Sequence, residues 1–132
     1  MVMGLNERRK IQLLLDVTLP ARIQEIAEIC GAAIPYEIDW TSFEGDMQGL
    51  TFLDYGSCHR LNMALRLICQ DGFGKEAVHD GLKLIKLRNV KSRDEMMMTF
   101  AAGILEMHCA YALQTDGLFS DGDIRDLLLK SL

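Results

Sequence analysis

Apolar side chains recur every three or four residues through the first third of the chain, which is the spacing of an amphipathic helix. Asn6 can cap the start of this helix. Pro20 interrupts the pattern and suits the first turn of a second helix, for which Thr18 is a candidate cap. Gly31 is a fitting end for that second helix. We therefore expect two separate helices, whose apolar stripes are Ile11, Leu14 and Leu15, then Ile23, Ile26, Ala27 and Cys30.

The spacing changes from helical to alternating after Pro35. Apolar and acidic side chains alternate over residues 35–40, which is the pattern of a strand with one buried face. Proline suits the start or the edge of such a strand. The single tryptophan lies on the apolar face and is expected to anchor the core. The apolar face holds Tyr36, Ile38 and Trp40, and the acidic face holds Glu37 and Asp39.

A second helical pattern runs from about residue 46 to residue 70. Gly56 weakens its middle by about 1 kcal/mol relative to alanine, so we expect a break there, with Ser57 capping the second piece. Turn residues follow, and a short helix is expected over 75–80. Near the C-terminus, Ser120 should cap a last helix, with Asp123 at the third position completing a capping box.

Two further segments have mixed patterns. Residues 83–90 alternate between apolar and basic side chains, so we expect a strand there. Residues 95–112 contain good helix formers behind a capping-box sequence. Their apolar positions nevertheless alternate on both sides of Gly103, which can supply the positive φ of a hairpin turn. The alternation favours two strands, and one long helix is the alternative.

Together these elements predict an α+β fold. Its sheet should be small and mainly antiparallel, and should comprise residues 35–40, 83–90, 95–100 and 103–111. Helices from the N-terminal third, the middle and the C-terminus are expected to cover this sheet. A nearly all-α fold with one short strand is the alternative. A length of 132 residues, without a repeat or a linker, predicts one domain over 1–132.

Charge limits the classes of partner. The chain has 14 basic and 19 acidic residues and a net charge of −5. This balance argues against general binding to nucleic acid or to a membrane, because both need a basic surface. Between Gly81 and Asp94, however, five basic residues occur without an acid. Apolar residues are interleaved with them, which favours the solvated face of a packed element over an anion site. The five are Lys83, Lys86, Arg88, Lys91 and Arg93.

The cysteines predict a compartment. They are far apart in the sequence, and we expect free thiols in a reducing cytoplasm. The first ten residues are polar and basic, without a following apolar run of signal-peptide length. No apolar stretch approaches the roughly 18 residues that a membrane span needs. The four are Cys30, Cys58, Cys69 and Cys109.

The pairs Cys58-His59 and His108-Cys109 come closest to a reactive cluster. Adjacent side chains point to opposite faces of a strand, or about 100° apart on a helix. The two members of one pair therefore cannot easily bind the same metal ion, and at best one member of each pair meets the other across the fold. Cysteine is often simply buried. We predict no metal and no cofactor.

Carboxylates and imidazoles provide candidates for acid–base catalysis, namely Asp39, Asp54, His59 and His108. Asp54 and His59 are five residues apart, which is not a same-face spacing on a helix. The sequence contains none of the common catalytic or phosphate-binding motifs. A catalytic site is therefore the less favoured hypothesis.

The start of the chain resembles the first two helices of a helix-turn-helix motif. Glu7 to Ile11 leads the first helix, and Arg22 to Gly31 resembles the positioning helix. A recognition helix with polar and basic side chains should follow, but the strand at 35–40 follows instead. An amphipathic helical pair that covers a sheet is preferred, and a helix-turn-helix-like regulator is a third hypothesis.

These observations favour a non-catalytic, cytoplasmic protein that acts by protein–protein contact, as an adaptor, an inhibitor or a regulator. An acidic surface can steer a basic partner. The apolar share of 49% is large for so small a protein, so either the core is dense or a second copy of the chain covers some of the apolar surface. A small enzyme or metal-dependent protein, using His59 and His108 with nearby carboxylates, is the alternative.

Three consecutive methionines, Met96, Met97 and Met98, cannot all face one core in any regular element. At least one thioether should lie near the surface, where methionine adapts well to a contact. Two-fold dimers are the commonest homo-oligomers. We therefore expect a homodimer to which residues 96–98 or the adjacent strand edge contribute.

Overall fold

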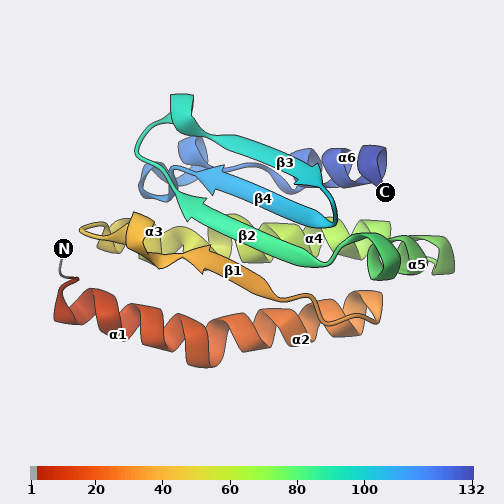
Figure 1. Cartoon of the computed structure of the whole chain (residues 1–132), viewed down its shortest axis with the longest axis horizontal. Helices are drawn as coiled ribbons and strands as arrows, with labels where there is room; N and C mark the ends of the chain where they lie inside the picture. The colour runs from red at the N-terminus through yellow and green to blue at the C-terminus, as the bar shows by residue number, and fades with distance from the viewer. Residues whose placement is uncertain (1–2) are drawn as a thin grey trace.

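The computed structural model describes residues 3–132, which form a four-stranded sheet flanked by helices (Figure 1). The strands are β1 (Tyr36–Asp39), β2 (Leu84–Asn89), β3 (Met97–Ala101) and β4 (Ile104–Cys109). The α-helices are α1 (Leu5–Leu13), α2 (Leu19–Cys30), α3 (Met47–Leu53), α4 (Arg60–Ile68), α5 (Gly72–Gly81) and α6 (Asp121–Ser131). Two π-helical segments are η1 (Leu14–Thr18) and η3 (Asp54–His59), and the 3₁₀ segments are η2 (Trp40–Phe43), η4 (Arg93–Glu95) and η5 (Tyr111–Gly117). Within residues 3–132, no helix is both long enough and apolar enough to cross a membrane.

The sheet has the strand order β1-β2-β4-β3. The predicted α+β class and its four strands are confirmed. The sheet is mixed, however, and not mainly antiparallel, because β1–β2 and β2–β4 are parallel and only β3–β4 is antiparallel. The helices α3, α4 and α5 connect β1 to β2, and a helical crossover of this kind brings the chain back in the same direction. In the β3–β4 hairpin, β4 is the strand that pairs with β2, and β3 lies at the edge of the sheet.

The core lies between one face of this sheet and the helices. In β2 and β4, buried apolar residues alternate with polar ones that are exposed or half-buried, so the opposite face is polar. Helices α3, α4 and α6 lie behind the sheet in Figure 1, and its polar outer face is turned toward the viewer. The buried positions are Ile85, Leu87, Leu105 and Met107, and the polar ones are Lys86, Arg88, Glu106 and His108.

Residues 95–112 contain the predicted hairpin and not a single helix. β3 and β4 pair from Met97–His108 to Ala101–Ile104. Ala102 and Gly103 close the hairpin with φ values of 53° and 80°. Both values lie in the left-handed region that a type I′ turn needs, which confirms the role predicted for the glycine.

The predicted break between the first two helices is wrong. α1, η1 and α2 run on as one continuous rod (Figure 1). Thr18 has a helical backbone and makes no capping hydrogen bond. The nitrogen of Pro20 cannot donate, and the π turn just before it relaxes the hydrogen-bond ladder at that point. The chain therefore passes the proline without a break.

The break predicted near Gly56 is wrong in the same way. α3, η3 and α4 form a second continuous rod, and Ser57 is buried inside it rather than capping a new helix. A Cβ on Gly56 would lie 2.5 Å from Leu118 Cδ2. The glycine is needed for this close contact and not for a break.

The start of the last helix is confirmed. The backbone N–H of Asp123 donates to Ser120 Oγ at 3.0 Å, as the capping box requires. The short helix expected at 75–80 is also present, but α5 begins earlier, at Gly72. Trp40 differs from the prediction, because it begins η2 instead of ending β1 and is only half-buried against the core.

Cys30 and Cys69 form a disulfide, which corrects the prediction of four free thiols. They lie at the C-terminal ends of α2 and α4, with their Cα atoms 5.5 Å apart. Their separation of 39 residues leaves no local signal, because only the packing of the two rods brings them together. Cys58 and Cys109 are free and buried.

Candidate partner-binding groove

An apolar groove of about 510 Å³ is lined by residues of α4, α5 and α6 and by the C-terminal Leu132. The ring of Phe73 is its most exposed wall, with 86% of the residue accessible. Leu67 on α4 and Leu129 on α6 are 48% and 59% exposed. The full lining comprises Leu67, Ile68, Gln70, Asp71, Phe73, Gly74, Ala77, Arg125, Leu129 and Leu132.

Tight packing at the start of α5 directs Phe73 outward. Asp71 caps the helix, since its Oδ1 accepts from the backbone N–H of Gly74 at 2.8 Å. A Cβ on Gly74 would overlap the carbonyl oxygen of Ile68, so this side of α5 lies directly against the end of α4. Phe73 is one residue earlier and about 100° away on the helix. Its ring therefore faces solvent beside the groove.

Other close contacts hold the walls of the groove in place. Cys69, which follows Ile68 in the floor, is joined to α2 by the disulfide. Leu132 packs so closely on α5 that a Cβ on Gly81 would lie 2.6 Å from Leu132 Cδ2. The groove is thus built on packed helices, and such sites need little rearrangement before binding.

The groove is suited to apolar contact and not to chemistry. Its charged members are already engaged, because Asp71 caps α5 and Arg125 Nη2 lies 3.2 Å from Asp126 Oδ1. Its lining, all within the described residues, contains no histidine, cysteine or serine. A concave apolar surface with a few polar groups at its rim is typical of a binding site.

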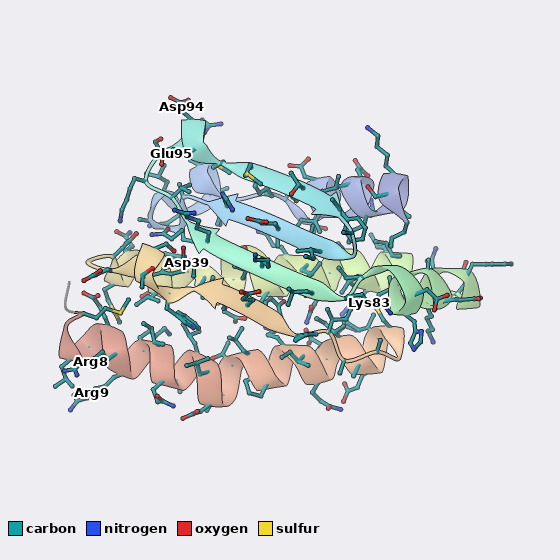
Figure 2. The ribbon with its side chains drawn as sticks, in the orientation of Figure 1. Arg8, Arg9, Asp39, Lys83, Asp94 and Glu95 are labelled. Carbon is teal, nitrogen blue, oxygen red and sulfur yellow. A yellow bond between two sulfur atoms is a disulfide. The ribbon has the colours of Figure 1, made fainter. Side chains whose placement is uncertain are left out.

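The catalytic candidates Asp39 and His108 lie on the outer face of the sheet and not in this groove. Figure 2 shows Asp39 at the end of β1. Its Oδ2 is 3.6 Å from Arg88 Nε, and His108 Nε2 is 2.7 Å from Glu106 Oε2. A polar hollow of about 340 Å³ opens on this face. Asp39 is paired with Arg88, and His108 is hydrogen-bonded to Glu106, so the two candidates do not form an acid–base pair with each other.

Asp54 and His59 are not brought together as a catalytic pair. Arg22 donates to both carboxylate oxygens of Asp54, from Nε at 2.7 Å and from Nη2 at 3.0 Å. This hydrogen bonding raises the pKa of the Arg22 guanidinium and joins the two helical rods. The His59 ring stacks on Tyr55 with 5.6 Å between centroids. Asp54 therefore has a structural partner.

The two free thiols belong to a buried polar cluster, which we define as Tyr36, Ser57, Cys58, Cys109 and Tyr111. Ser57 Oγ is 2.6 Å from the Tyr111 hydroxyl and 3.9 Å from Cys109 Sγ. Burial, assisted by the charge of Asp54, raises the pKa of Cys58 to about 12. Burial also raises the pKa of Cys109. At neutral pH both groups are therefore thiols and not nucleophilic thiolates.

The Cys-His pairs separate in the structure. Cys109 points to the inner face of β4 and His108 to the outer face, while Cys58 is buried and His59 only half-buried. The fold brings the two cysteines into one cluster and leaves the two histidines outside it. Within residues 3–132, no group of three candidate ligands could hold a metal ion.

The three methionines lie at the free edge of the sheet. Met96 directly precedes β3, and Met97 and Met98 begin it. All three are half-buried, with Met98 packed against the core. Met97 pairs with His108 and shares the outer face with it.

Phe73 and its groove were missed by sequence reasoning. The available signal was an aromatic residue between two glycines, directly after the capping Asp71. Leu67 and Leu129 likewise lie outside the buried stripes of α4 and α6. Single exposed apolar residues are common and carry little information. Only the packing of three helices gathers these side chains into one surface.

No protein-family model, curated protein or solved structure matches this chain. Its function is therefore inferred from its own surfaces.

Proposed function

We propose that this protein is non-catalytic and acts by protein–protein contact, as an adaptor, an inhibitor or a regulator, with the apolar groove as the contact surface. The observation that carries the proposal is the exposure of Phe73, a residue of the groove lining that is 86% accessible. Exposed apolar side chains that form one surface mark interaction sites, whereas scattered ones do not. Aromatic residues are also enriched in the buried centres of interfaces.

The proposed occupant is one amphipathic helix of a partner protein. Helix-in-groove recognition buries apolar anchors at positions i, i+3 or i+4, and i+7. Three helices form the walls of this groove, and its 510 Å³ can take a small number of such side chains. Asp71 and Arg125 are already bonded within the chain. The partner therefore needs no charged side chain to pair with them in the groove. Burying such a charge would be costly.

The alternative hypotheses have less support. An enzyme that uses His59 and His108 would need the two imidazole rings close together. His59 is on the helical rod behind the sheet, whereas His108 is on the outer face of β4, so the sheet separates them. A helix-turn-helix-like regulator would need a turn between the first two helices, where the chain instead continues as one rod. No nucleic acid or membrane partner is proposed.

A cytoplasmic location is also part of the proposal. The free Cys58 and Cys109 agree with a reducing compartment, whereas the Cys30–Cys69 disulfide counts against one. Alkylation of thiols in intact cells tests the location, because a cytoplasmic protein should keep Cys30 and Cys69 largely reduced. Self-association is proposed through residues 96–98 or the adjacent strand edge, and not through the groove.

The test compares wild type with Phe73→Ala in a pull-down from native extract, followed by titration of the recovered partner. Phe73→Ala should raise the dissociation constant about thirtyfold or more, which corresponds to roughly 2 kcal/mol at an interface centre. Val17→Ala is the matched control, because Val17 is also exposed but lies on η1, away from the groove lining. It should leave the affinity unchanged.

Two results would overturn the proposal in different ways. A partner bound equally by wild type and by Phe73→Ala would mean that the groove is not the contact surface. Turnover of a substrate by the purified protein, lost in a His59→Ala or His108→Ala variant, would restore the enzyme hypothesis.

A further inference from the structure

The outer edge of β3 lacks the features that usually prevent strand edges from pairing with other chains. β3 is the last strand of the sheet, so among residues 3–132 one of its two edges pairs with no other strand. From Met97 to Ala101 it contains no charged residue and no proline, and its register with β4 is continuous, without a bulge. Proteins normally protect an exposed edge with one of these features.

The hairpin turn determines which backbone groups face outward. In a two-residue hairpin, the pair that flanks the turn is hydrogen-bonded, and bonded pairs then alternate along the ladder. Ala101–Ile104 flanks this turn, so Thr99 and Met97 also bond to β4. The N–H and C=O groups of Met98 and Phe100 therefore point to the free edge.

We propose that a second copy of this chain pairs with β3 in antiparallel orientation, with the two-fold axis at Thr99. In this register, Met98 of each copy lies opposite Phe100 of the other. The outward N–H and C=O groups of both residues then form hydrogen bonds with the second copy. An axis at Phe100 would place Met98 opposite the turn residue Ala102, so it would leave outward groups unpaired.

The side chains also suit this register. Met98 and Phe100 are half-buried on the inner face and pack against the core. Placing them opposite each other across the axis continues the apolar inner layer from one copy into the next. Thr99 is exposed on the outer face. Thr99 of the two copies would lie directly opposite, and threonine pairs are favourable across antiparallel strands.

The charges beside the edge support an antiparallel second copy as the occupant. Figure 2 shows Asp94 and Glu95 just before β3. The proposed register places Glu95 opposite Gly103 of the second copy, so the acidic starts of the two strands lie at opposite ends of the contact. A parallel copy would bring these like charges together, which is unfavourable.

The contact is small, since one five-residue strand from each copy forms it. Stable interfaces usually bury more than about 1,000 Å², so we expect a dissociation constant on the order of micromolar or weaker. This inference specifies the self-association part of the proposed function and is independent of the groove.

Sedimentation at about 1 to 300 µM tests the dimer, a range chosen for a micromolar constant. The mass should rise from near the 14.9 kDa of one chain toward twice that value. Thr99→Lys and Thr99→Glu should each weaken the dimer about tenfold or more, because like charges would face each other at the axis. A mixture of these two variants should restore the dimer, because lysine then faces glutamate. Thr51→Lys, at an exposed position of α3, is the matched control and should dimerise like wild type.

Each outcome decides a specific point. Wild type that stays a monomer at 300 µM would overturn the dimer. An unchanged dimer in Thr99→Lys, or a mixture that does not reassociate, would overturn the axis at Thr99. Phe73→Ala should dimerise normally and Thr99→Lys should still bind the groove partner, so failure of one proposal can be told from failure of the other.

Discussion

The buried polar cluster and the apolar groove reverse the usual distribution of side chains. The cluster encloses hydroxyls and thiols beneath the sheet, whereas the groove leaves Phe73 and two leucines exposed to solvent. Burial removes reactivity from the cluster, because it raises the pKa of both thiols. Exposure gives the groove binding potential, because apolar surface removed from water contributes about 25 cal/mol per Å². Residue chemistry alone would therefore select the cluster, whereas exposure favours the groove as the proposed contact surface.

The reactivity of the free thiols is the strongest test of this contrast. The pKa of Cys58 rises from 9.0 to about 12, which lowers its thiolate fraction at neutral pH by roughly a thousandfold. In folded protein at pH 8, a disulfide reagent that reports thiols should therefore leave Cys58 and Cys109 unmodified, and both should react in urea. Ser131→Cys, at an exposed position, should react at once as the control. Rapid labelling of either thiol in the folded state would contradict the burial and show that the cluster is open to solvent.

The disulfide next to the groove floor should give the largest change in stability. It closes a loop with a sequence separation of 39, for which chain entropy predicts a contribution of about 4 kcal/mol. Urea unfolding in the presence of a reductant should show this loss in wild type. The double variant Cys30→Ala, Cys69→Ala should have a similarly low stability and should not respond to the reductant. Wild type that is equally stable with and without the reductant would show that the bond is absent in solution.

The hydrogen bond inside the polar cluster should have a smaller effect. Tyr111→Phe keeps the ring contact with Phe43 but leaves the buried Ser57 hydroxyl only its longer contact with Cys109 Sγ at 3.9 Å. The lost hydrogen bond should lower the free energy of unfolding by about 1 to 3 kcal/mol. The double variant Ser57→Ala, Tyr111→Phe should lose less free energy of unfolding than the sum of the two single variants, because both partners of the hydrogen bond are then removed together. Tyr55→Phe, at an exposed position, is the control. A fully additive double variant would contradict the hydrogen bond.

The sequence was informative where the structure depends on neighbouring residues. Gly103 identified the hairpin because its positive φ is a local requirement, and Ser120 identified the start of α6 because the cap bonds only three residues ahead. Alternation of apolar and polar residues located the strands. It could not give their direction, because parallel pairing depends on the helices that connect β1 to β2.

The errors share the opposite cause, which is distance along the chain. Gly56 indicated a break, but its missing side chain instead makes room for Leu118, 62 residues later by number. Cys30 and Cys69 meet only because the two rods pack side by side. The groove needs residues from α4, α5 and α6 at once. Contacts of this kind depend on tertiary packing, so no regular spacing in the sequence predicts them.

The smallest expected effect is the change in folding stability caused by Phe73→Ala. It tests whether the Phe73 side chain is exposed beside the groove. Because 86% of the residue is exposed, Phe73→Ala should change the free energy of unfolding by no more than about 0.5 kcal/mol. Phe43→Ala is the matched comparison, because that ring is fully buried and its loss should cost about 3 to 5 kcal/mol. Urea unfolding of the two variants measures both values. A loss above about 1 kcal/mol at Phe73 would mean that the ring packs into the fold in solution, and the groove would then lack its exposed anchor.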